Sequence, residues 1–159
     1  MSNARPTQPI RDEHAELIPH IEELRHLGDT ALAGEADLSA DLQRSVEFLI
    51  QHLLVHAGAE DRVLYPQVAD IIGAPKATAT MSRDHIEVER LSRELASTSA
   101  SDRGTVARLA YALHAIVSLH FAKEEEIYLE LMDAAMNTES VAVMYQRMEE
   151  AAAALKPQA

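Results

Sequence analysis

Four segments of the chain repeat apolar residues at intervals of three or four, and each of these apolar stripes includes a histidine. Residues at that spacing share one face of an α-helix, so the pattern predicts four amphipathic helices that bury this face. The histidines should therefore point into the same interior as the apolar side chains. They are His14, His56, His85 and His120.

Turn-forming residues separate the expected helices. Pro19 lies inside the first stripe, where the loss of one hydrogen bond predicts a kink and not an end. The first helix is expected from Thr7–Pro9 to Gly28–Gly34, with Ile18 on its apolar stripe. The second begins at Ser39–Asp41 and runs past Leu64, with a break or kink at Pro66. The third runs from Pro75 to Ser97, and the fourth from Asp102, a predicted cap, to Met136, with Ile127 and Leu131 on its stripe.

Four long helices with short connections pack most simply as an up-down-up-down four-helix bundle. The predicted fold is therefore all-α, with the bundle over residues 7–136 and a shorter fifth helix over 138–155. The fifth helix either docks on the bundle or forms a homodimer interface with a second subunit. Ser2-Asn3-Ala4 looks like the remnant of an expression tag, so residues 1–6 are expected to be disordered.

Charge and composition narrow the possible functions. The chain of 159 residues has 14 basic and 26 acidic side chains, a net charge of −12 that disfavours nucleic acid and anionic membrane surfaces as partners. It has no cysteine, so a metal would have to be held by His, Asp and Glu. Neither a secretory signal nor a membrane-spanning run is evident, and a cytoplasmic protein is expected.

Three of the stripe histidines are followed four residues later by a glutamate. Residues four apart differ by about 40° around a helix axis, so each pair projects to one side. Because isolated charges are costly in an apolar interior, a shared cation is the physical reason to bury so many of them. With His14, the pairs His56 and Glu60, His85 and Glu89, and His120 and Glu124 form the predicted metal-ligand set.

A ligand set of this size suits two metal ions better than one, because carboxylates bridge cations whereas imidazoles terminate them. Glu60 and Glu124, on opposing helices, are the expected bridges. Glu125, five residues after His120, is the alternative to Glu124.

These residues resemble the hemerythrin-like, or HHE cation-binding, family. The resemblance rests on His14, on His56-Ala-Gly-Ala-Glu60 with the following Asp-Arg-Val-Leu-Tyr-Pro, on Arg-Asp-His85, and on His120-Phe-Ala-Lys-Glu124, and it covers about residues 10–133. It implies a hemerythrin-type bundle that coordinates two iron ions, bridged by oxo or hydroxo, and binds dioxygen or a related small molecule.

The third helix departs from the oxygen-carrier pattern, since Glu89 stands where a carrier has a second histidine. A carboxylate there should favour the oxidised metal, which argues against reversible oxygen carriage. The primary hypothesis is a protein that binds or senses O2 or NO, or handles iron, without an organic substrate. The alternatives are a di-iron enzyme that decomposes peroxide or nitric oxide, and a metal-free helical scaffold for a protein partner.

The remaining histidines and two tyrosines are weaker candidates. His52 is expected at the bundle boundary, with ligation or hydrogen bonding to a ligand as alternatives. Tyr65 and Tyr128 follow the two His-Glu pairs and either line the pocket or pack in the core. His20, His26 and His114 lack support as ligands.

Overall fold

The computed structural model describes residues 5–34 and 37–156, and every regular element in these ranges is helical. Residues 1–4 of the predicted tag remnant lie outside the described residues, whereas Arg5 pairs with Glu130 at 2.5 Å. The first rod is α1 (Gln8–Ala33). The second rod consists of α2 (Ser39–Phe48), η1 (Leu49–Leu53), α3 (Leu54–Ala59), η2 (Glu60–Leu64) and α4 (Tyr65–Ile72), and the third is α5 (Ala79–Ala96). The fourth rod consists of α6 (Arg103–Lys123), η3 (Glu124–Tyr128) and α7 (Leu129–Ala135), and α8 (Thr138–Leu155) follows it.

The rods end at the residues that favour helix termini. Gly34 and Gly73 adopt left-handed conformations after α1 and α4, with φ of 80° and 71°, which glycine accepts without a Cβ clash. The predicted cap at Asp102 is confirmed, because its side chain accepts a hydrogen bond from the Thr105 amide at 3.2 Å. Asn137 caps α8 in the same way through Ser140.

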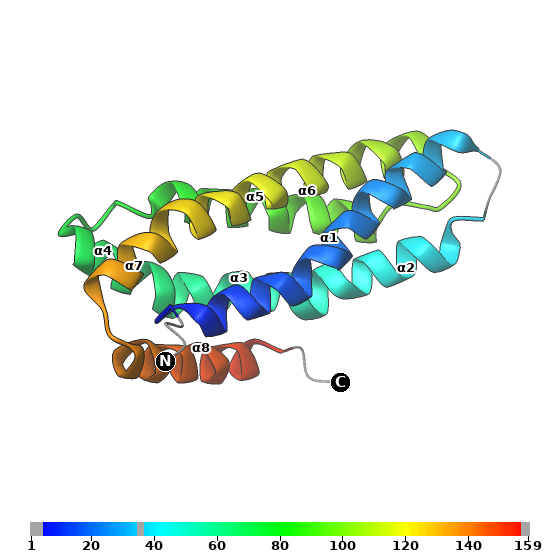
Figure 1. Cartoon of the computed structure of the whole chain (residues 1–159). Coiled ribbons are helices and arrows are strands. Elements are labelled where there is room, and N and C mark those ends of the chain that lie inside the picture. Colours follow the sequence, from blue (N-terminus) through cyan, green and yellow to red (C-terminus); the bar gives the residue numbers. More distant parts are fainter. Residues whose placement is uncertain (1–4, 35–36, 157–159) are drawn as a thin grey trace.

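The four long rods pack antiparallel to their sequence neighbours, and the fourth returns to lie along the first (Figure 1). The predicted all-α, up-down-up-down bundle is therefore confirmed. The α1 helix runs continuously through Pro19. By length and composition alone the rod over residues 103–135 could cross a membrane, a property that core helices of bundles share.

A polar layer divides the bundle core into two apolar clusters. On α1 the layer lies between Ile21 of the first apolar cluster and Ile10 of the second cluster. On the fourth rod it lies between Val117 of the first cluster and Leu129 of the second. Each of the four stripe histidines occupies this layer, so the apolar clusters hold the helices on both sides of it.

Three π-helical turns interrupt the α-helical register, and two of them begin at Glu60 and Glu124. A π turn adds a residue and rotates everything after it around the helix axis. The prediction that Ile127 and Leu131 face the core is wrong for this reason, because they are 51% and 40% exposed while Leu129 is buried. Ile18, also predicted to be buried, is 47% exposed.

The fifth helix, α8, docks on its own bundle and buries Val141, Met144 and Met148 against the second cluster. In Figure 1 it lies along one side of the bundle, below α1 and α3. Gly58 of α3 permits this approach, since a Cβ there would lie 2.7 Å from Leu155 Cδ1.

Candidate metal centre

The polar layer brings together one histidine from each rod and two glutamates. His14 comes from α1, His56 from α3, His85 from α5 and His120 from α6, and none is more than 8% exposed. Glu60 and Glu124 begin the π turns η2 and η3 and are fully buried. Six of the seven predicted ligands therefore meet in one interior.

Each of the four histidines is held from outside by a carboxylate of an adjacent rod. In every case the Nδ1–H donates to the carboxylate, which leaves the Nε2 lone pair directed inward, as in metal sites that orient their histidines in this way. The pairs are His14 with Glu125 at 2.7 Å, His56 with Glu13 at 3.0 Å, His85 with Asp61 at 2.9 Å and His120 with Asp84 at 3.0 Å.

These outer carboxylates form a closed ring around the bundle. Each rod contributes an inward ligand and, next to it in the sequence, the acid that holds the histidine of the next rod. Glu13, which precedes His14, holds His56 of the second rod, and Asp61, which follows Glu60, holds His85 of the third. Asp84, which precedes His85, holds His120 of the fourth rod, and Glu125, which follows Glu124, holds His14 of the first. The ring thus ties all four rods to the orientation of the ligands.

Inside the ring the donor atoms lie close together without forming a hydrogen-bonded network. His56 Nε2 is 2.9 Å from Glu60 Oε1, yet makes no hydrogen bond with it. Both oxygens of Glu60, one of Glu124, and the Nε2 atoms of His14 and His56 are buried without a hydrogen-bond partner. Such orphaned atoms are rare in native proteins unless an ion or water completes them.

His85 and His120, which face each other in the layer, also indicate a bound cation. The Nε2 atoms of His85 and His120 are 3.0 Å apart. With the ring proton of each on Nδ1, two lone pairs face each other and repel unless a cation or proton lies between them. The donor set therefore fits a bound cation.

Two groups of three residues have ligand atoms within 4.8 Å of one another, namely His14 with His56 and Glu60, and His85 with His120 and Glu60. Glu60 belongs to both groups, with Oε2 lying 3.3 Å from His85 Nε2. Glu124 also spans the halves, since its oxygens lie 3.6 Å from His14 Nε2 and 3.4 Å from His120 Nε2. Both expected bridges occupy positions between two sites.

The electrostatics of the layer favour positive charge. Burial lowers the pKa of His14, but its hydrogen bond with Glu125 and the negative charge of the nearby Glu60 outweigh burial and raise it to about 9. The pKa of His85 is also raised to about 9, with burial opposed by Asp61 and Glu60. Burial raises the pKa of Glu60, yet the positive charge of His56 and the nearby imidazoles of His14 and His85 lower it well below the ordinary value. Without a metal, protons on the imidazoles balance the carboxylates, and a cation would replace them.

Tyr65 reaches this cluster from the start of α4. Its hydroxyl donates to Glu124 Oε1 at 2.5 Å and lies 3.0 Å from His120 Nε2. Burial and the charges of Glu60 and Glu124 raise the pKa of the phenol, so the hydroxyl keeps its proton. Tyr128, the other tyrosine considered, points away and contacts the Ala77 carbonyl.

A small cavity of about 10 Å³ adjoins the ligands on the side of the first apolar cluster. His56, His85 and His120 form its polar wall together with Glu60. Its other wall is apolar and consists of Leu53, Ala57, Val88, Val117 and Phe121. Phe121 also stacks on the His14 ring, with centroids 4.4 Å apart.

The structure does not bring Glu89 into the cluster. Its side chain is 51% exposed and forms an ion pair with Arg93 at 2.7 Å. A spacing of four residues after His85 does not by itself bring Glu89 into the core. The buried face of α5 extends from His85 toward Val88 and Ser92, and Glu89 lies on the other side of His85. The choice between Glu124 and Glu125 has a clear outcome, since Glu124 points inward and Glu125 holds His14 from outside.

The other four histidines lie away from the cluster. His52 is exposed and stacks near Phe48, with ring centroids 6.3 Å apart. His26 is exposed, His20 pairs with Glu23, and His114 contacts Glu22 at 3.0 Å.

Sequence reasoning missed the ring of outer carboxylates. The sequence pattern assigns no role to Glu13, Asp61 or Asp84, and it predicts Glu125 either as an alternative ligand or as part of a solvated face. A signal was present, because each of these acids is adjacent in sequence to a predicted ligand. Its meaning depends on which rods are neighbours, which periodicity does not reveal.

The described geometry agrees with the comparison of the sequence with known families. The hemerythrin HHE cation-binding domain matches residues 5–132, a range that contains all four histidines and both buried glutamates. Comparisons with curated proteins and with solved structures gave no significant match. On the family match, the four-helix fold and the buried histidine and glutamate cluster, the chain belongs to the hemerythrin HHE cation-binding family.

Proposed function

We propose that this protein holds two iron ions in the polar layer and uses them to bind a small molecule such as O2 or NO. The protein ligands would be His14, His56, Glu60, His85, His120 and Glu124. The observation that carries the proposal is the inward convergence of four oriented imidazoles on two buried carboxylates, of whose oxygens only Glu124 Oε1 accepts a hydrogen bond.

The donor chemistry supports iron in each half. One half offers His14, His56 and a Glu60 oxygen, and the other offers His85, His120 and an oxygen of Glu60 or Glu124. Two histidines and a carboxylate are typical of non-heme iron sites with open coordination positions. Two halves that share Glu60 favour a pair of ions with a carboxylate bridge over two independent ions.

The surroundings support a small ligand and not an organic substrate. The adjoining cavity, at about 10 Å³, has about the volume that a water molecule requires. Its apolar wall, which includes Leu53, Val88 and Val117, would favour an uncharged molecule such as O2 or NO over an ion.

A second candidate is turnover of peroxide or nitric oxide at the same site, and Tyr65 is the observation that favours it. A bound iron pair would supply the redox chemistry and the open positions. Tyr65 would hold a proton beside Glu124 and His120, within reach of a small molecule at that half.

The test is to load the metal-free protein with Fe²⁺ without oxygen, expose it to air, and record the iron content and visible spectrum. We expect absorption characteristic of an oxo-bridged iron pair, followed by spectral changes on addition of NO. Repeated consumption of peroxide would favour the enzyme. A folded bundle that takes up no metal would contradict both functions and favour a helical scaffold.

A further inference from the structure

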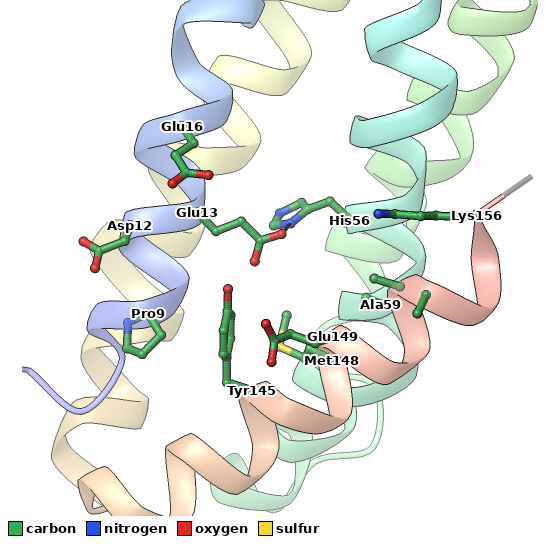
Figure 2. A pocket seen from close by; sticks show the side chains of 12 residues that line it. Pro9, Asp12, Glu13, Glu16, His56, Ala59, Tyr145, Met148, Glu149 and Lys156 are labelled. Carbon is green, nitrogen blue, oxygen red and sulfur yellow. Dashed lines mark hydrogen bonds and ion pairs between the residues drawn. The ribbon is translucent and has the colours of Figure 1, made fainter.

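A groove lined by acidic side chains leads from solvent to the back of His56. It is lined by residues of α1, α3 and α8 and has a volume of about 360 Å³. In Figure 2, Asp12, Glu13 and Glu16 extend from α1, Tyr145 and Glu149 extend from α8, and the Glu13 carboxylate reaches the His56 ring. The groove therefore connects the surface with a residue of the metal centre.

The charge of this groove is poorly compensated. None of the carboxylates of Asp12, Glu13, Glu16 and Glu149 forms an ion pair with an arginine or lysine in the part of the chain that the structure describes. Lys156 is the one basic side chain among the described lining residues. Burial and the charges of Glu13 and Glu149 raise the pKa of Tyr145 to about 12, in keeping with a negative potential there.

The corner of the carboxylate ring at Glu13 differs from the other three. Glu125 is paired with Arg11, and Asp84 with Lys123. Asp61 accepts a hydrogen bond from the Ser82 hydroxyl at 2.6 Å. Glu13, 33% exposed, faces the groove with more carboxylates instead of a cation.

The inner end of the groove also points to a ligand. The His56 side chain is 3% exposed, and its Nε2 has no hydrogen-bond partner although it lies 2.9 Å from Glu60 Oε1. A cation bound at Glu13 would be separated from His56 Nε2 and Glu60 Oε1 by the width of one imidazole ring.

We propose that this groove is the uptake route for the metal: Asp12, Glu16 and Glu149 attract a divalent cation from solvent, and Glu13 passes it to His56 and Glu60. The inference rests on the proposed metal centre and adds a path to it. Closely spaced like charges in a cleft raise the local concentration of the opposite ion and speed its association, by about tenfold or more at low ionic strength. The groove acids lie outside the cluster, so they should change the rate of loading and leave the final metal content unchanged.

The experiment follows the uptake of Co²⁺ by the metal-free protein in a stopped-flow spectrometer, with Co²⁺ as the probe because its visible absorption reports binding directly. The variant is the triple substitution Asp12→Asn, Glu16→Gln and Glu149→Gln. We expect an initial rate about tenfold below wild type at low salt, with the same final number of ions per chain. The difference should shrink as salt is added, because salt screens exposed charges.

A matched control carries the same change of charge elsewhere, with Asp70→Asn, Glu23→Gln and Glu47→Gln at exposed positions outside the groove. It should load at nearly the wild-type rate. Equal loading rates of the groove variant and wild type, or an equally slow control, would overturn the uptake route and leave the metal centre intact. Fewer ions in the groove variant at equilibrium would also overturn it, by making these acids ligands. A wild-type protein that binds no metal would contradict the proposed function itself.

Discussion

The two halves of the polar layer contain similar ligands in different surroundings. In the half formed by His14 and His56, both Nε2 atoms lack hydrogen-bond partners. In the half formed by His85 and His120, the Nε2 atoms lie 3.3 Å and 3.0 Å from the hydroxyl of Tyr65. The first half is thus a bare set of ligands, and the second combines ligands with a proton donor. In the proposed function both halves hold metal, and only the second has a hydroxyl proton donor beside its ligands.

Glu60 joins the two halves, and its removal should have the largest effect. Glu60→Ala takes an oxygen from both ligand groups, so we expect both ions to be lost. Metal content per chain after loading with Fe²⁺ measures this directly. Glu89→Ala is the matched control and should keep two ions, because Glu89 is exposed and paired with Arg93. A Glu60 variant with two ions would remove the basis for a shared bridge.

Loss of a histidine should empty one half more than the other. His56→Ala and His120→Ala each remove a terminal ligand and leave buried carboxylates without a counter-charge, so metal affinity should fall more than about 100-fold and thermal stability should drop. Isothermal titration with Co²⁺ and thermal unfolding provide the two readouts. His26→Ala, at an exposed position, should match wild type. Damage from His26→Ala equal to that from His120→Ala would require a new ligand assignment.

The outer carboxylates should contribute less than the ligands that they hold. Asp84→Asn weakens the support of His120, and Glu13→Gln weakens that of His56. Loss of such support typically lowers metal affinity 10–100-fold, and we expect that range for both variants in the same titration. Affinities equal to wild type would show that the ring does not orient the ligands.

The pH dependence of stability should separate the metal-free from the loaded protein. The pKa of His14 and of His85 is raised from 6.5 to about 9 in the folded protein, so each contributes stability that is complete below pH 6.5 and lost as the pH rises through 9. The contribution is at most about 3 kcal/mol for each histidine. Chemical unfolding of the metal-free protein should therefore show falling stability between pH 6.5 and 9. The stability of the loaded protein should change much less over the same range, because metal occupies these imidazoles and the histidines of the unfolded chain are already mostly neutral above pH 6.5. Parallel curves for the two forms would contradict this exchange.

Tyr65→Phe should have the smallest effect on bound metal and a selective effect on reactivity. The variant keeps all six ligands and removes one hydroxyl, so the iron content should match wild type. If the second half acts on peroxide, its rate of consumption should fall about 100-fold, within the range typical of a lost proton donor. Unchanged consumption would limit Tyr65 to a structural contact with Glu124.

Helical spacing was sufficient to predict the bundle and most of the residues that meet in the buried cluster. His14, Glu60 and Glu124 lie where a period of 3.6 residues places them, because the apolar stripe and the ligand share one face. Glu89 has the same spacing from its histidine, yet the buried flank of α5 lies on the other side. Periodicity alone does not distinguish these two flanks.

Two kinds of feature could not be derived from the sequence. The π turn after Glu124 rotates the helix and exposes Ile127, and nothing in the apolar pattern marks where such a turn begins. The contact between Asp84 and His120 depends on the packing of α5 against α6, which is a property of the assembled bundle. Local patterns thus identify most of the buried histidines and glutamates of the cluster, while tertiary packing decides how they are held.

X-ray absorption at the iron edge of the air-oxidised, iron-loaded protein tests the paired centre most directly. We expect scattering from a second iron at about 3.5–4 Å, as in two-metal sites, with nitrogen and oxygen ligands around each iron. The same measurement on Glu89→Ala should be unchanged. A spectrum with nitrogen and oxygen neighbours but no iron neighbour would contradict a shared di-iron centre.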